Sequence, residues 1–69
     1  MKTLRLSEIT RLTSRKGVRS DLVKEFLGSL SNIKTEQDAL EELQEVATAR
    51  KWNRATQRAI RDGIGMIYR

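Results

Sequence analysis

Residues 6–30 contain two amphipathic segments, one on each side of Gly17. The first segment repeats Leu6, Ile9 and Leu12 at helical spacing. The second carries a broad apolar stripe made of Leu22, Val23, Phe26, Leu27 and Leu30. A stripe this broad has to pack against more than one other helix. The chain has no proline, and no useful stretch alternates β-branched or aromatic residues with polar ones, so the pattern predicts an all-α fold.

Capping residues predict where the helices begin and end. Ser7 is a good N-cap for the first helix, and Gly17 is a natural left-handed stop after it. Ser20 caps a second helix over residues 20–30, and Thr35 caps a third. Asn53 caps a fourth helix after a corner at Trp52, although one continuous helix through this point stays open.

The 69 residues predict a single helical domain over 1–69, with three or four short helices. A chain of this length buries only about 60% of the surface that its unfolded form exposes, so we expect marginal stability. The predicted core residues are Leu6, Ile9, Leu12, Val18, Leu22, Val23, Phe26, Leu27, Leu30, Leu40, Leu43, Ala47, Trp52, Ile60 and Ile64.

The charged residues divide the chain into distinct segments. Residues 1–19 hold six basic groups and one acid, and residues 49–69 hold the same numbers. Residues 35–48 hold five acids and no base, whereas residues 20–34 are balanced. The formal net charge is +5, and a basic field attracts polyanions such as nucleic acid. The alternative is that the acidic helix pairs with its basic neighbours inside the fold.

Several classes of function have little support in the composition. The chain has no histidine and no cysteine, and it has no phosphate-binding glycine loop, so we expect no enzyme, no metal site and no cofactor. No apolar run approaches the roughly 20 residues that span a bilayer, and residues 1–8 lack a signal-peptide core. We therefore expect a cytoplasmic protein with no membrane partner and no small-molecule substrate.

Residues 6–30 resemble the helix-turn-helix that opens regulators of the lac-repressor family. Ile9, Gly17 and Val18 match the first part of that pattern, and Val23, Phe26 and Leu27 match the second. Residues 14–16 form a three-residue insertion before the turn glycine, and Thr10 stands where the family prefers alanine. The resemblance implies that the second helix faces the DNA groove through Arg19, Ser20, Asp21, Lys24 and Glu25. An ordinary helical hairpin with a polar outer face is the alternative.

A second basic feature is a row of arginines on the predicted fourth helix. Arg54, Arg58 and Arg61 recur at i, i+4, i+7 opposite the isoleucines, with Arg50 and Lys51 just upstream. This arginine ridge is able to line a phosphate backbone. The alternative is a solvated face, or ion pairs with the equally spaced acids Asp38, Glu42 and Glu45 of the third helix.

These patterns favour a small DNA-binding accessory or regulatory protein whose partner is duplex DNA and which is a monomer or a homodimer. The predicted nucleic-acid-binding residues are Arg15, Lys16, Arg19, Ser20, Asp21, Lys24, Arg54, Arg58 and Arg61. The alternative function is a non-enzymatic adaptor that binds a protein partner through its acidic face (35–48) and its basic face (49–69). Trp52 and Tyr68 are predicted to serve the core instead of a stacking platform, which usually needs several aromatics.

Overall fold

The computed structural model describes residues 4–68, so residues 1–3 and 69 of the predicted domain lie outside the description. The elements in chain order are α1 (Leu6–Thr13), α2 (Ser20–Gly28), the 3-10 turn η1 (Ser29–Asn32), α3 (Glu36–Arg50) and α4 (Arg54–Ile67). No strand occurs within residues 4–68, and the predicted all-α class is confirmed. None of the described helices is long and apolar enough to cross a membrane.

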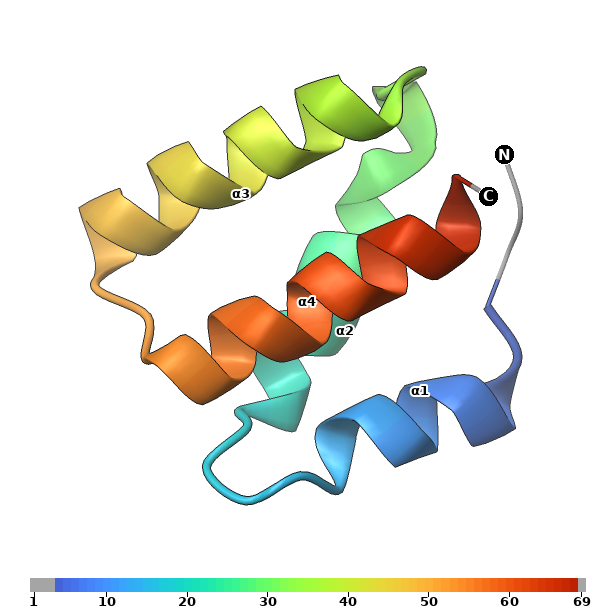
Figure 1. The fold of residues 1–69 in the computed structure, drawn as a ribbon, viewed down its shortest axis with the longest axis vertical. Coiled ribbons are helices and arrows are strands. Elements are labelled where there is room, and N and C mark those ends of the chain that lie inside the picture. Colours follow the sequence, from blue (N-terminus) through green and yellow to red (C-terminus); the bar gives the residue numbers. More distant parts are fainter. Residues whose placement is uncertain (1–3, 69) are drawn as a thin grey trace.

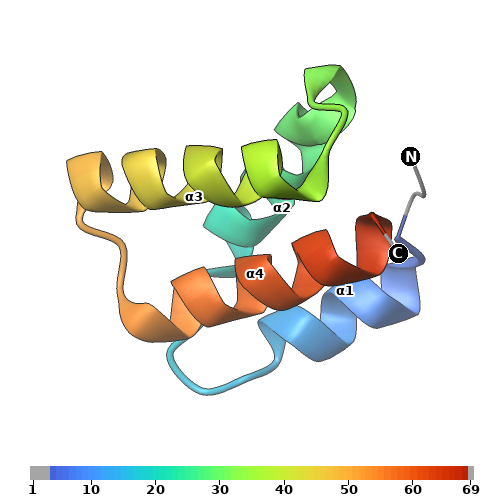
Figure 2. The same cartoon turned by 45° about the horizontal axis from the view of Figure 1, so that its top comes forward.

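Helix α4 is the centre of the domain. It packs against α1, α2 and α3, while α1, α4 and α3 lie side by side and α2 passes behind α4 (Figures 1 and 2). The apolar side of α4 is fully used by these three neighbours, because Ala59, Ile60 and Ile64 have no exposed surface. The polar side of α4 is left facing solvent.

Most of the predicted core residues are confirmed. Leu12, Val23, Phe26, Leu30, Leu43, Ala47, Ile60 and Ile64 are buried, and Ile9, Val18, Leu27, Leu40 and Trp52 pack against them while partly exposed. Two predicted core residues do not belong to this set. Leu6 is 76% exposed, and Leu22 is half-buried and is not among the residues that pack against the core cluster. Leu4, Ala39, Ala59 and Ile67 complete the core.

The N-cap of the first helix lies two residues before the predicted cap Ser7, and the helix ends earlier than expected. Arg5 is the N-cap residue, and its backbone N–H donates to the Glu8 carboxylate at 3.0 Å. This hydrogen bond satisfies the backbone N–H of the N-cap residue, so Ser7 is not the cap of this helix. The helix ends at Thr13, so Gly17, with φ of +83°, shapes the loop instead of stopping the helix. The loop from residue 14 to residue 19 is longer than the usual turn of about three or four residues in a helix-turn-helix.

The second helix also differs from the predicted range of 20–30. Its N-cap is Arg19 instead of Ser20, and its α-helical part ends at Gly28, after which the chain tightens into η1. Glycine is a poor helix former, which suits this early end. The backbone N–H of Ile33 then donates to the carbonyl of Leu30 and closes the turn.

The predicted starts of the last two helices are confirmed. Thr35 accepts a hydrogen bond from the Asp38 N–H, and Asn53 accepts one from the Thr56 N–H. Helices α3 and α4 are separate, because Lys51 adopts the left-handed conformation (φ 56°, ψ 46°) and turns the chain. This outcome settles the open question of a continuous helix.

Helix α4 runs through both of its glycines. Gly63 is buried where α1 and α2 press on α4, since a Cβ there would lie 3.0 Å from Leu27 Cδ1 and 3.3 Å from Leu12 Cδ1. After α4, the Tyr68 hydroxyl donates to the Ile33 carbonyl at 2.7 Å and fastens the end of the helix to the α2–α3 connection.

Candidate nucleic-acid interface

Two loops that are far apart in the sequence meet at one end of the domain. In Figure 1 the α3–α4 loop lies at the left edge and the α1–α2 loop lies at the bottom, both away from the two termini. The Asn53 side chain donates to the Gly17 carbonyl at 2.8 Å, and the Arg19 N–H donates to the Thr56 hydroxyl at 3.0 Å. Thr56 is fully buried, so this second bond fixes the start of α2 against the start of α4.

The joined loops carry five exposed basic residues, which we call the basic end: Lys16, Arg19, Arg50, Lys51 and Arg54. Arg19, Arg50 and Lys51 line one surface depression, Lys16 precedes Gly17, and Arg54 follows Asn53. The nearest ion pair is weak, because the Arg19 guanidinium lies 3.7 Å from the Asp21 carboxylate and both side chains are largely exposed. The basic end therefore gathers cations from two regions of the chain that are far apart in the sequence.

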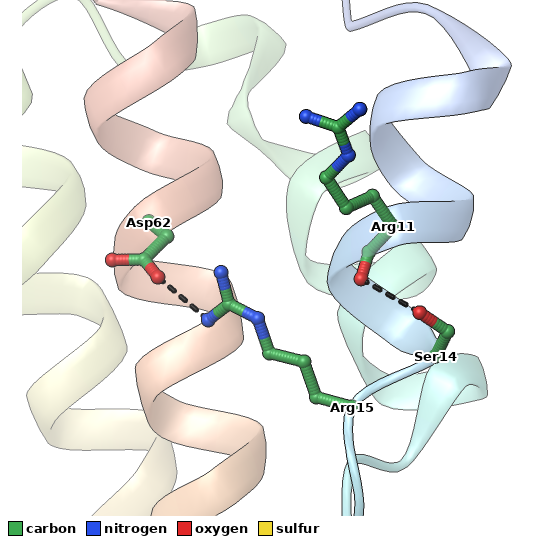
Figure 3. Close-up of polar contacts among 4 residues, drawn as sticks. All are labelled: Arg11, Ser14, Arg15 and Asp62. Atoms are coloured by element: carbon green, nitrogen blue, oxygen red, sulfur yellow. Dashed lines mark hydrogen bonds and ion pairs between the residues drawn. The ribbon is translucent and has the colours of Figure 1, made fainter.

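Arg15 belongs to the same loop but is engaged elsewhere. Its guanidinium reaches across to α4 and pairs with the Asp62 carboxylate at 2.6 Å (Figure 3). The hydroxyl of the neighbouring Ser14, the C-cap residue of α1, donates to the Arg11 carbonyl. The ion pair ties the α1–α2 loop to α4, and its two charges cancel at this place.

The free face of α2 is not basic. Its exposed charged residues are Asp21, Lys24 and Glu25, which sum to a charge of −1. Ser20, Asp21 and Lys24 are exposed as the helix-turn-helix prediction requires, yet this helix by itself offers phosphate little attraction. The cations that adjoin α2 come from Arg19 and from the α3–α4 loop.

The arginine ridge lies on the exposed side of α4, as predicted. Arg54, Arg58 and Arg61 line an open groove of about 910 Å³ between α3 and α4. Glu41 is the acid that α3 contributes to this groove, whereas Asp38, Glu42 and Glu45 are not part of its lining. Within residues 4–68 the ridge forms no ion pair with α3, so the alternative of pairing across the two helices is wrong.

Trp52 marks the boundary between the core and the basic end. Its ring meets Phe26 edge to face, with centroids 6.1 Å apart and planes at 82°. The other side of this half-buried residue borders a depression of about 340 Å³, together with Arg19, Leu22, Arg50, Lys51 and Asn53. The predicted role of Trp52 as a plug at the helix corner is thus confirmed, and the ring also contributes to the surface.

All nine residues predicted to bind nucleic acid are exposed, but the fold divides them. It joins the loop that holds Lys16 and Arg19 to the start of α4, where Arg54 lies, holds Arg15 in an ion pair, and places Arg58 and Arg61 farther along α4. Sequence reasoning noted Arg50 and Lys51 only as neighbours of the ridge. The signal that unites them with Lys16 and Arg19 is the contact between the two loops, which no sequence spacing reveals.

Comparison with known proteins assigns the chain to no family. No family model matches it, and no curated protein or solved structure is significantly similar to it. What the described residues define is a class of fold, a small all-α domain of four helices centred on α4.

Proposed function

We propose that this protein binds duplex DNA and that the basic end supplies the main contacts to phosphate. One observation carries the proposal, namely that two loops and the helix ends beside them carry five exposed cations and are joined by two hydrogen bonds between side chains and backbone. Cations held on a rigid base contact phosphates at a smaller entropic cost than cations on a mobile chain. The arginine ridge extends the same positive surface along α4.

In this proposal, the basic end sets the orientation of helix α2 on the DNA. Its first turn lies next to the basic end, because Arg19 is both its N-cap and a member of that cluster. Phosphate contacts at the basic end then place Ser20, Asp21 and Lys24 next to a groove. Phosphate contacts fix the register of a protein on DNA, and contacts to base edges set sequence preference.

The test is a titration of a fluorescent duplex at 50 and 200 mM salt. If all five cations of the basic end contact phosphate, the affinity falls with a logarithmic salt slope of about −4.5, which is about 500-fold between these concentrations. Replacing Lys16 by glutamine should weaken binding to every duplex sequence alike and reduce the slope by about one.

Lys34→Gln is the matched control. It removes the same charge from an exposed lysine in the α2–α3 connection. That connection is about 22 Å from the basic end, because the 15 residues of α3 separate the two. The proposal requires Lys16→Gln to weaken binding more than Lys34→Gln does. Equal effects would mean that only the net charge matters, and the absence of duplex binding at 50 mM salt would refute the proposal.

A protein-binding adaptor is the second candidate, and one observation favours it. Asp38, Glu42 and Glu45 are exposed on α3 and form no ion pair within the described residues. They leave an acidic face available to a basic partner. Charge reversal at Glu42 and Glu45 should abolish capture of such a partner and leave the thermal unfolding temperature nearly unchanged.

A further inference from the structure

The depression beside Trp52 has a basic part and an apolar part, and duplex binding does not require the two side by side. Arg19, Arg50 and Lys51 provide positive charge, whereas Leu22 and Trp52 provide an apolar border. Its volume of about 340 Å³ is at the lower end of the range for ligand sites, which suits one small group instead of a helix or a duplex. A planar ring that carries an anionic group matches both halves of this lining.

Trp52 is held in place before any ligand arrives. Its backbone N–H donates to the Ala47 carbonyl at 3.0 Å, and its carbonyl accepts from the Gln57 amide at 2.7 Å. Phe26 supports the ring from the core side. A base that packs against this indole therefore does not have to order it first, which favours binding.

The backbone conformation of Lys51 is a second notable feature of the depression. Lys51 adopts a left-handed conformation that glycine adopts with less strain, yet the residue is a lysine that lines the depression. Strained backbone conformations concentrate at functional sites.

We infer that this depression binds an unpaired nucleotide, with the base against Trp52 and the phosphate at Arg19, Arg50 and Lys51. The inference rests on the proposed binding of nucleic acid. It adds that the preferred nucleic acid is a duplex that ends in, or is interrupted by, an unpaired base. Duplex phosphates contact the rest of the basic end, and the unpaired nucleotide enters the depression.

The experiment compares three forms of one DNA hairpin: blunt, with a three-thymidine 5′ overhang, and with three abasic sites in that overhang. The abasic form keeps the phosphates and lacks the bases. Since Trp52 is the only tryptophan, its emission reports on the depression directly. We expect the thymidine overhang to bind about tenfold more tightly than the abasic one and to quench the emission more strongly.

Two variants locate the effect. Trp52→Leu keeps an apolar side chain against Phe26 and should remove the preference for thymidine over abasic overhangs. Lys51→Gln should weaken binding of both overhangs and leave that preference in place, because it removes a phosphate contact and no stacking surface. Equal affinity and equal quenching for the two overhangs in the wild-type protein would overturn the inference. If duplex binding then persists, the proposed function stands; if no hairpin binds at low salt, the proposed function itself is wrong.

Discussion

Replacing Lys51 by glycine should make the protein more stable. Lys51 lies at the left-handed position that ends α3, with φ of 56° and ψ of 46°. An L-residue in this conformation costs roughly 1–2 kcal/mol, and glycine avoids that cost. Glycine loses more backbone freedom on folding, by about 0.5–1 kcal/mol. The difference predicts a gain of about 0.5–1 kcal/mol in the free energy of unfolding.

The assay is urea and thermal unfolding followed by far-ultraviolet circular dichroism. For a domain of this size, the expected gain corresponds to a rise of about 2–8 °C in Tm with an unchanged urea m-value. Lys51→Ala is the matched control, because it removes the same charge from the basic end and keeps the left-handed strain. If the glycine variant is no more stable than the alanine variant, the strain argument is refuted.

The same pair of variants separates stability from binding. Both remove one cation from the basic end, so both should lose a phosphate contact and lower the salt slope by about one. The glycine variant should therefore be more stable than the wild-type protein and bind duplex DNA less well. Weaker binding by a better-folded variant cannot be ascribed to unfolding.

Two further predictions concern the core and the end of the chain. Phe26→Ala should cost about 3–5 kcal/mol, because it removes a buried ring and the support of Trp52, and it should leave this small domain largely unfolded by circular dichroism; an unchanged Tm would place Phe26 outside the core. Tyr68→Phe should cost about 0.5–1.5 kcal/mol in urea unfolding through the lost hydrogen bond to the Ile33 carbonyl. Burial, together with the Asp38 carboxylate, raises the pKa of the Tyr68 hydroxyl. The stabilisation by this hydroxyl is therefore full below pH 10 and is lost as the pH rises above 10. The wild-type protein should then lose more stability above pH 10 than Tyr68→Phe does, and equal losses would contradict this.

Local chemistry in the sequence predicts the last two helices well. Thr35 and Asn53 act as caps because a short oxygen-bearing side chain reaches the N–H three residues later wherever the backbone enters a helix in this way. The same logic misplaced the first two helix starts. Ser7 and Ser20 are residue types that cap equally well. The first helix nevertheless begins earlier because Glu8 bonds the Arg5 N–H, and the second because the Arg19 N–H bonds Thr56.

Periodicity predicts which face of a helix is apolar, and packing decides which residues of that face are covered. Leu6 and Ile9 share a face in the sequence, yet Leu6 lies at the free end of α1 and stays exposed. Gly63 shows the opposite case. Glycine is a poor helix former, but at this position it allows Leu12 and Leu27 to approach α4 closely.

The sequence by itself determined the helical class, the exposed arginine ridge and the separation of acidic from basic segments, because these depend on composition and on spacing within single helices. Only the tertiary structure decided that the cations converge. Lys16 and Lys51 are 35 positions apart, and what unites their loops is the bond from the Asn53 side chain to the Gly17 carbonyl and the bond from the Arg19 N–H to Thr56. Long-range hydrogen bonds of this kind leave no periodic trace in a sequence, since their partners are chosen by how the helices pack.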